Sequence, residues 1–174
     1  MSIIPRILTD PLMGFNFRIA LIDDSSQLKA AMGGVGLVIG GFTECTGLDA
    51  SMQIEEYMEG GENTYVHKFP GRISWGNITL KRGITLSEDL WNWHYSFVQG
   101  KGTRRDGLIV LQNELQMPVK TWVFKGGLPV KWSGPSFNAS QNAVAIETME
   151  IAHEGVKLGS PGRAAASFAS AIGL

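Results

Sequence analysis

The feature that most limits the possible folds of this chain is a two-residue alternation of apolar and other side chains. Phe15, Phe17, Ile19 and Leu21 alternate with Asn16, Arg18 and Ala20. A period of two places successive side chains on opposite faces of a strand. Strand-like segments recur along the chain with glycine, proline and asparagine between them, at residues 37–46, 51–58, 64–69, 73–82, 107–116, 119–125 and 143–153. The sequence therefore predicts a mainly β fold, a small β-barrel or β-sandwich.

The apolar period changes once, near the middle of the chain. Five residues there recur at three- and four-residue spacing, as on one face of a helix: Leu90, Trp93, His94, Phe97 and Val98. Before them, residues 85–88 read TLSE, which matches a capping box in which Thr85 and Glu88 satisfy each other's backbone N–H groups. Gly100 is a natural stop. We expect one flanking helix at about 87–99.

Length and composition indicate one domain. The chain has 174 residues, 44% hydrophobic and 18% charged, which suffices for a core and argues against disorder. We expect a single domain over 1–174, with its core at about 10–158 and a C-terminal tail at 159–174. The N-terminus lacks the pattern of a secretory signal, so we expect synthesis in the cytoplasm. The longest apolar stretch, residues 30–42, is too short to cross a bilayer, which needs about 20 residues of helix, so no membrane insertion is expected.

A search for chemistry finds no reactive constellation. The glycine-rich segment 33–40 has Ile39 where a dinucleotide-binding fingerprint needs glycine. The histidines His67, His94 and His153 are far apart in sequence, and Cys45 is the single cysteine. We therefore expect no enzymatic activity, no cofactor and no metal site, with Cys45 as a buried thiol.

Charge is segregated along the chain. Residues 49–62 contain five acidic and no basic side chains, whereas residues 67–82 contain four basic and no acidic ones. One interpretation is a solvated hairpin beside a solvated strand. The other is that an acidic hairpin arm of one copy meets a basic surface of another, a head-to-tail contact that generates rings or filaments. The candidate contact residues are Glu55, Glu56, Glu59, Glu62, Lys68, Arg72, Lys81 and Arg82.

Eight short segments, in this order, resemble the tail tube proteins of contractile phage tails and phage-tail-like injection systems. They are DPL with FNF at 10–17, FTECTGL at 42–48, EYMEGGEN at 56–63, FPGR at 69–72, LKRG at 80–83, LWNW at 90–93, PVKWSGP at 129–135 and IETMEIAHEG at 146–155. Each is weak alone. Together they cover residues 10–158.

The resemblance implies a structural protein whose copies form stacked hexameric rings around a channel for cargo or DNA. It implies as partners further copies of the chain, a sheath protein, and baseplate, spike and tube-terminating proteins. The chain would join a phage tail or a phage-tail-like particle, and release of that particle from the cell is one outcome. Residues 55–68 would form the arm between subunits or rings. Alternatives are a secreted tube protein of a type VI-like system and a monomeric β-barrel that binds an apolar ligand. A nucleic-acid binder is disfavoured because the net charge is −1.

Overall fold

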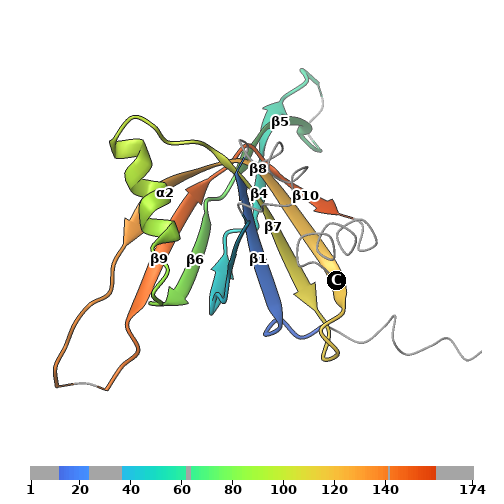
Figure 1. The fold of residues 1–174 in the computed structure, drawn as a ribbon. Helices are drawn as coiled ribbons and strands as arrows, with labels where there is room; N and C mark the ends of the chain where they lie inside the picture. The colour runs from blue at the N-terminus through green and yellow to red at the C-terminus, as the bar shows by residue number, and fades with distance from the viewer. Residues whose placement is uncertain (1–11, 24–36, 62–63, 141, 160–174) are drawn as a thin grey trace, which may run out of the picture.

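The computed structural model describes residues 12–23, 37–61, 64–140 and 142–159 (Figure 1). Glu62, most of the glycine-rich segment and the C-terminal tail after residue 159 lie outside the described residues. The elements are one helix and ten strands within the described part: β1 (Phe17–Asp23), β2 (Leu37–Gly40), β3 (Glu44–Thr46), β4 (Ala50–Tyr57), β5 (His67–Trp75), β6 (Ile78–Gly83), α2 (Asp89–Val98), β7 (Arg105–Gln112), β8 (Pro118–Ser133), β9 (Ile146–Ala152) and β10 (Val156–Gly159). The predicted mainly β class is confirmed.

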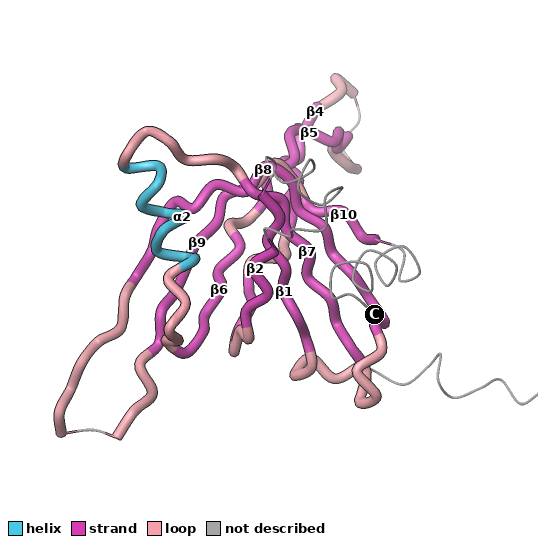
Figure 2. The backbone as a smooth tube through the Cα atoms, in the orientation of Figure 1, coloured by secondary structure: helices cyan, strands magenta, loops and turns pink. Residues whose placement is uncertain are grey.

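Eight strands form one antiparallel sheet in the order β2-β1-β7-β8-β9-β6-β3, with β10 also paired to β8 (Figure 2). The first half of β8 pairs with β7 and β10, and its second half pairs with β9. The sheet therefore folds over along β8 into two facing halves. Within the described residues no ladder joins β2 to β3, so the barrel expected as one possibility does not close, although only residues 41–43 separate these two strands.

Two glycines let β8 bend without ending. Gly126 has a φ of 64°, which an L side chain rarely adopts, and a Cβ on Gly127 would lie 2.6 Å from the Arg105 carbonyl oxygen. The sequence pattern ended the predicted strand at residue 125. That end is wrong, because pairing with β7 on one side and β9 on the other carries the strand through to Ser133.

The core lies between the two halves of the sheet and beneath α2. Alternate residues on the facing strands point inward, as the period of two predicts. The innermost side chains are at most 3% exposed: Ile19, Leu21, Ile78, Leu80, Leu90, Trp93, Ile109, Phe124, Met149 and Ile151. These positions form one continuous apolar core, which fixes both the sheet register and the seat of the helix.

The predicted helix is confirmed, but its start differs. It begins at Asp89, and Glu88 makes no side-chain capping bond. Instead Thr85 Oγ1 accepts a 3.3 Å hydrogen bond from the Ser87 N–H, and Ser87 Oγ accepts one from the Asp89 N–H at 3.4 Å. The predicted capping box is therefore wrong, because a Ser/Thr turn takes its place. His94 packs as expected, with Nδ1 3.1 Å from the Pro129 carbonyl oxygen.

Two predicted strands are each split in the structure. Residues 37–46 become β2 and β3, which lie at opposite ends of the strand order. Residues 73–82 are divided between β5 and β6 at Gly76, where a Cβ would lie 2.7 Å from the Asp49 carboxylate. Each break changes the strand partner, so that β4 and β5 leave the main sheet as a separate hairpin.

Candidate assembly surfaces

The hairpin of β4 and β5 projects from one end of the sheet, and we call it the arm (Figures 1 and 2). Its two strands pair with each other and with no other strand in the described part of the chain. Its root is fixed by close packing. Gly47, with a φ of 87°, lies so near the backbone of Asn77 that a Cβ would clash, and the Trp75 ring contacts His153 with centroids 6.2 Å apart. A fixed root presents the arm in one direction, which lowers the entropic cost of a contact.

Both faces of the arm expose large apolar side chains. Residues directly opposite each other across a hairpin share a face, and successive residues of a strand alternate between the two faces. Trp75 lies opposite Ala50 and Ile73 opposite Met52 on one face, whereas Tyr57 lies opposite His67 on the other face. On the first face Met52, Ile73 and Trp75 are 39% to 53% exposed; on the second, which we call the aromatic face, Tyr57 and Phe69 are 58% and 52% exposed. So much exposed apolar surface on a narrow hairpin is typical of a surface that a partner covers.

His67 lies on the aromatic face, together with Tyr57 and Phe69. Its ring centroid is 5.0 Å from that of Tyr65, and 6.5 Å from those of Tyr57 and Phe69. Its Nε2 lies 3.2 Å from Glu59 Oε2. These contacts hold the aromatic rings together at the outer part of the arm.

Polar pairs are also divided between the two faces of the arm. The hydroxyls of Ser51 and Ser74 are hydrogen-bonded at 2.7 Å, and Glu56 lies opposite Lys68 in the register. Part of the segregated charge is therefore balanced within the arm itself. The arm places Glu55, Glu56, Glu59, Lys68 and Arg72 together, with Glu62 outside the described residues.

The other two predicted contact residues lie in the main sheet. Lys81 Nζ binds both carboxylate oxygens of Glu44, at 2.9 and 3.0 Å. Arg82 is 3% exposed, and its Nε donates to Glu147 Oε1 at 2.5 Å. The other carboxylate oxygen of Glu147 accepts a 2.9 Å bond from Trp132 Nε1. Arg82 is thus an internal cross-link between β6 and β9, and it is not available to another subunit.

Sequence reasoning missed a polar sheet face. We call β3, β6, β9 and the second half of β8 the four-strand segment. Its inward positions are mainly apolar, whereas its outward positions form rows of hydroxyl and charged residues across the strands. One row is Thr46, Thr79, Glu150 and Lys131; the next is Glu44, Lys81, Thr148 and Ser133. All eight are exposed or half-buried.

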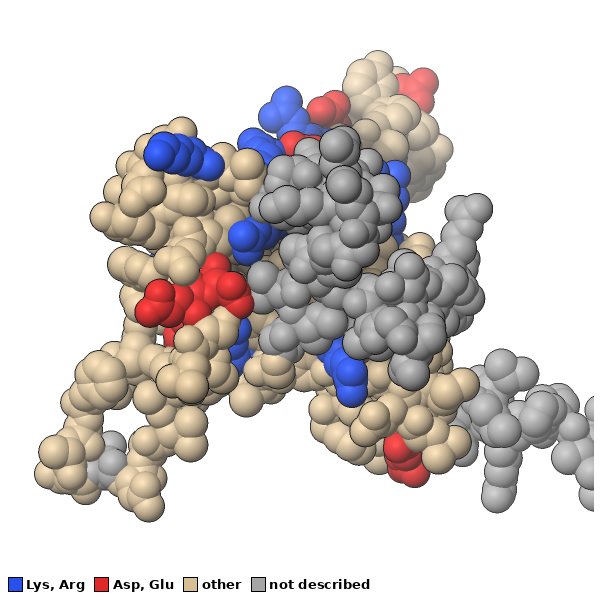
Figure 3. All heavy atoms as spheres, viewed as in Figure 1, with Lys and Arg blue, Asp and Glu red and all other residues tan. Residues whose placement is uncertain are grey.

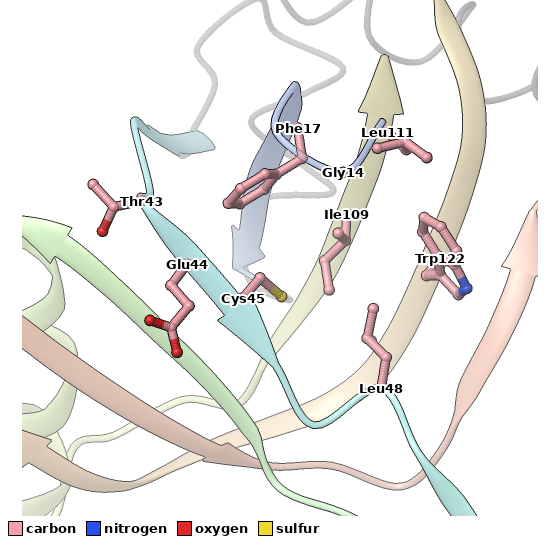
Figure 4. Close-up of a pocket in the computed structure, with 9 residues that line it drawn as sticks. All are labelled: Gly14, Phe17, Thr43, Glu44, Cys45, Leu48, Ile109, Leu111 and Trp122. Atoms are coloured by element: carbon pink, nitrogen blue, oxygen red, sulfur yellow. The ribbon is translucent and has the colours of Figure 1, made fainter. Parts of the chain in front are cut away.

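A cavity of about 270 Å³ lies between β3 and the strands β1, β7 and β8 (Figure 4). Phe17, Ile109 and Trp122 line it, and the Cys45 thiol borders it. Burial raises the pKa of Cys45 from 9.0 to about 11, so the thiol stays protonated and unreactive at neutral pH. Cys45 is half-buried, so it is less enclosed than the buried thiol expected from sequence.

The described residues offer little for metal or membrane chemistry. They contain no cluster of three or more histidine, cysteine and acidic side chains placed to hold a metal ion. None of their helical segments has the length and apolarity that a bilayer crossing requires. On the face shown in Figure 3, lysine and arginine side chains lie at several separate places, unlike the continuous basic stripe typical of nucleic-acid binders.

The fold matches solved tube-bearing assemblies. One matching chain is from a cryo-EM structure of the anti-feeding prophage baseplate, 6-fold symmetrised, with a TM-score of 0.76 and 22% identity over 87% of this chain and 97% of that one. Another is from the PVC sheath-tube complex of an extracellular contractile injection system in the extended state, with a TM-score of 0.74 and 23% identity over 92% of this chain and 99% of that one. No curated protein sequence matched.

A sequence family described as the T4-like virus tail tube protein gp19 matches residues 13–157. The match spans the main sheet, the arm and the helix, and it leaves out the two ends of the chain. The chain therefore belongs to the family of T4-like virus tail tube proteins and is a structural subunit of a tail tube.

Proposed function

We propose that this tube subunit forms six-membered rings that stack into the inner tube of a contractile injection particle, and that it has no catalytic role. The observation that carries the proposal is the four-strand segment, whose inner face is mainly apolar and whose outer face is polar and uncovered. The matched 6-fold symmetrised baseplate and the sheath-tube complex support a ring of six within a sheathed tube.

The outer face of the four-strand segment is well suited to line the channel. Its two rows contain two glutamates and two lysines, so the face carries no net charge. Glu44 and Lys81 neutralise each other directly, and Glu150 also accepts a 2.8 Å bond from Asn77 Nδ2. A wall of hydroxyls and paired charges would give cargo or DNA only weak, nonspecific contact.

The edges of this segment suggest how rings close. Its strands are all antiparallel, and their number is even, so the two edge strands, β3 and the second half of β8, run in opposite directions. No other strand in the described part of the chain pairs with either outer edge. Placed side by side, the β8 edge of one copy and the β3 edge of the next would continue the antiparallel pattern around the ring.

The arm would pack against a neighbouring subunit through its exposed apolar side chains, chiefly Tyr57 and Phe69 of the aromatic face. In our proposal the charged residues have a secondary role, because Glu56 is opposite Lys68 and exposed pairs contribute only about 0–1 kcal/mol each. Glu55, Glu59 and Arg72 would lie at the rim of the contact and set its orientation.

The proposal also includes the other proteins of the injection particle. The partners would be a sheath protein, a baseplate or spike, and a tube-terminating protein. The chain would fold as one domain before it joins the particle.

Negative-stain microscopy and sedimentation velocity of the purified protein test the proposal. We expect rings or tubes at high protein concentration, with longer tubes when the sheath protein is present. A strictly monomeric protein under both conditions would contradict it.

The channel wall has its own test in a Cys45→Ser background. Thr148→Cys should react in assembled tubes with a small maleimide and not with one attached to a large polymer. Leu158→Cys, on β10, is the matched control. Equal labelling of Thr148→Cys by both reagents in intact tubes would show that this face is not in the lumen.

A further inference from the structure

The outer face of α2 carries a row of large side chains that are not part of the buried core. Trp91, Tyr95 and Val98 follow one another at four- and three-residue spacing, so they share one helical face, and they are 40%, 42% and 69% exposed. We call these three residues the helix ridge. The Trp91 and Tyr95 rings are stacked with centroids 5.5 Å apart, and the Trp132 ring meets Trp91 edge-on at 4.7 Å. Rigid, exposed aromatic side chains of this kind are typical anchors of protein interfaces.

The cavity next to β3 reaches the surface, and we call it the mouth (Figure 4). Phe17, Ile109 and Trp122 form apolar walls, and the exposed residues Gly14 and Leu48 lie at its rim. An engineered apolar cavity of about 150 Å³ holds benzene. The mouth has about 270 Å³, so it leaves room for an indole ring. Filling it with an apolar side chain would remove these walls from water, which is favourable.

The helix ridge and the mouth lie at the two ends of one row of the four-strand segment. In the register, Trp132 lies opposite Met149, Met149 opposite Leu80, and Leu80 opposite Cys45, all on the inner face. Trp91 packs against the first residue of this row, and the last residue, Cys45, borders the mouth. When β8 of one copy lies beside β3 of the next, as the proposed ring requires, the row of one copy continues into the row of the next. The helix ridge then faces the mouth.

We propose that the helix ridge of each subunit fills the mouth of the next subunit in the same ring. This contact rests on the proposed tube function and deepens it, because it names the side chains that join neighbours behind the channel wall. Trp91 and Tyr95 of one copy would pack against Phe17 and Leu48 of the next, on the side of the four-strand segment away from the lumen. The residues of the helix ridge are uncharged and the walls of the mouth are apolar, so apolar burial alone would stabilise the contact. The neighbour would thereby complete the wall around this part of the core.

Disulfide trapping tests this contact. In a Cys45→Ser background, the double variant Leu48→Cys with Tyr95→Cys should give covalent products of up to six subunits on mild oxidation, and no larger ones, since the contacts close within one ring. Each single-cysteine variant should give no product, because the contact joins two different surfaces. Products larger than six subunits would overturn the contact within a ring. Rings that form normally and give no product, also when Trp91→Cys replaces Tyr95→Cys, would overturn it as well and leave the mouth to an apolar ligand or to another part of the same chain.

A substitution experiment separates the possible failures. Trp91→Asp with Tyr95→Asp places two charges against the apolar mouth and should weaken each subunit contact at least about thirtyfold, measured by mass photometry of rings over a concentration series. The matched control Leu115→Asp changes an exposed residue of the turn between β7 and β8 and should form rings like the wild type. Melting curves at concentrations too low for assembly check the fold, and Tyr95→Asp alone replaces the double variant if that variant melts early. Normal rings from the helix variant would refute this inference alone, whereas a strictly monomeric wild-type protein would refute the proposed function.

Discussion

Replacing two aromatic residues of the arm should weaken assembly without affecting the fold. Complete burial of a large apolar side chain contributes about 1.5–3 kcal/mol. Tyr57 and Phe69 are 58% and 52% exposed in the single subunit. Burying that exposed part against a neighbouring subunit contributes about 1 kcal/mol for each side chain and about 2 kcal/mol for the pair. Tyr57→Ser with Phe69→Ser should therefore reduce the association constant of each arm contact about 30-fold.

Sedimentation velocity across a concentration series measures this change as a higher critical concentration for tubes. The matched control is Glu56→Ala with Lys68→Ala, a cross-strand pair on the face of the arm opposite Tyr57 and Phe69. Loss of an exposed pair should change the constant less than about fivefold. Melting curves of both variants should match the wild type at concentrations too low for assembly. If the control weakened assembly more than the aromatic variant, charge rather than apolar burial would drive docking, and our reasoning would be refuted.

Two further predictions concern the main sheet. Glu147→Leu removes the carboxylate that pairs with the buried Arg82 guanidinium and should lower the free energy of unfolding by about 3–5 kcal/mol, measured by urea denaturation. Adding Arg82→Met should recover most of this loss, because no buried charge is then left unpaired. Equal stability of the single and double variants would contradict this. Burial raises the pKa of Cys45 from 9.0 to about 11, so the folded state holds this proton more tightly than the unfolded state. The free energy of unfolding should therefore fall as pH rises from 9 to 11. Cys45→Ala should remove this contribution to the pH dependence, as measured by denaturant unfolding at each pH.

Much of the sheet could be predicted from the sequence because the alternation is strong where one face is buried. Ile78 and Leu80 in β6, and Met149 and Ile151 in β9, carry that signal and lie at 0% exposure. The same alternation could have placed Arg82 on the inner face of β6, because it follows Ile78 and Leu80 at a spacing of two residues. Its charge suggested the surface, but its position in the alternation puts it on the inner face.

The aromatic face of the arm could not be read in the same way. Between the pairs Met52–Ile73 and Ile54–Pro70, β4 advances by two residues and β5 by three, so the alternation changes phase within β5. As a result Phe69 and Ile73 lie on opposite faces of the arm. Only the pairing with β4 shows that Phe69 shares its face with Glu55 and Tyr57. The bend of β8 was hidden for a similar reason, since long-range pairing overrides the local tendency of Gly126 and Gly127 to form a turn.

The β4–β5 and β7–β8 hairpins should form early when the chain folds. Each joins strands that are neighbours in the sequence, whereas Ile19 of β1 pairs with Ile109 of β7, ninety residues further along the chain. Local hairpins form in about 1–10 μs, and contacts between distant segments form much later. The apolar side chains that both hairpins expose would therefore be present before the core closes, and neighbouring chains on one messenger would have to be kept apart until each has finished folding.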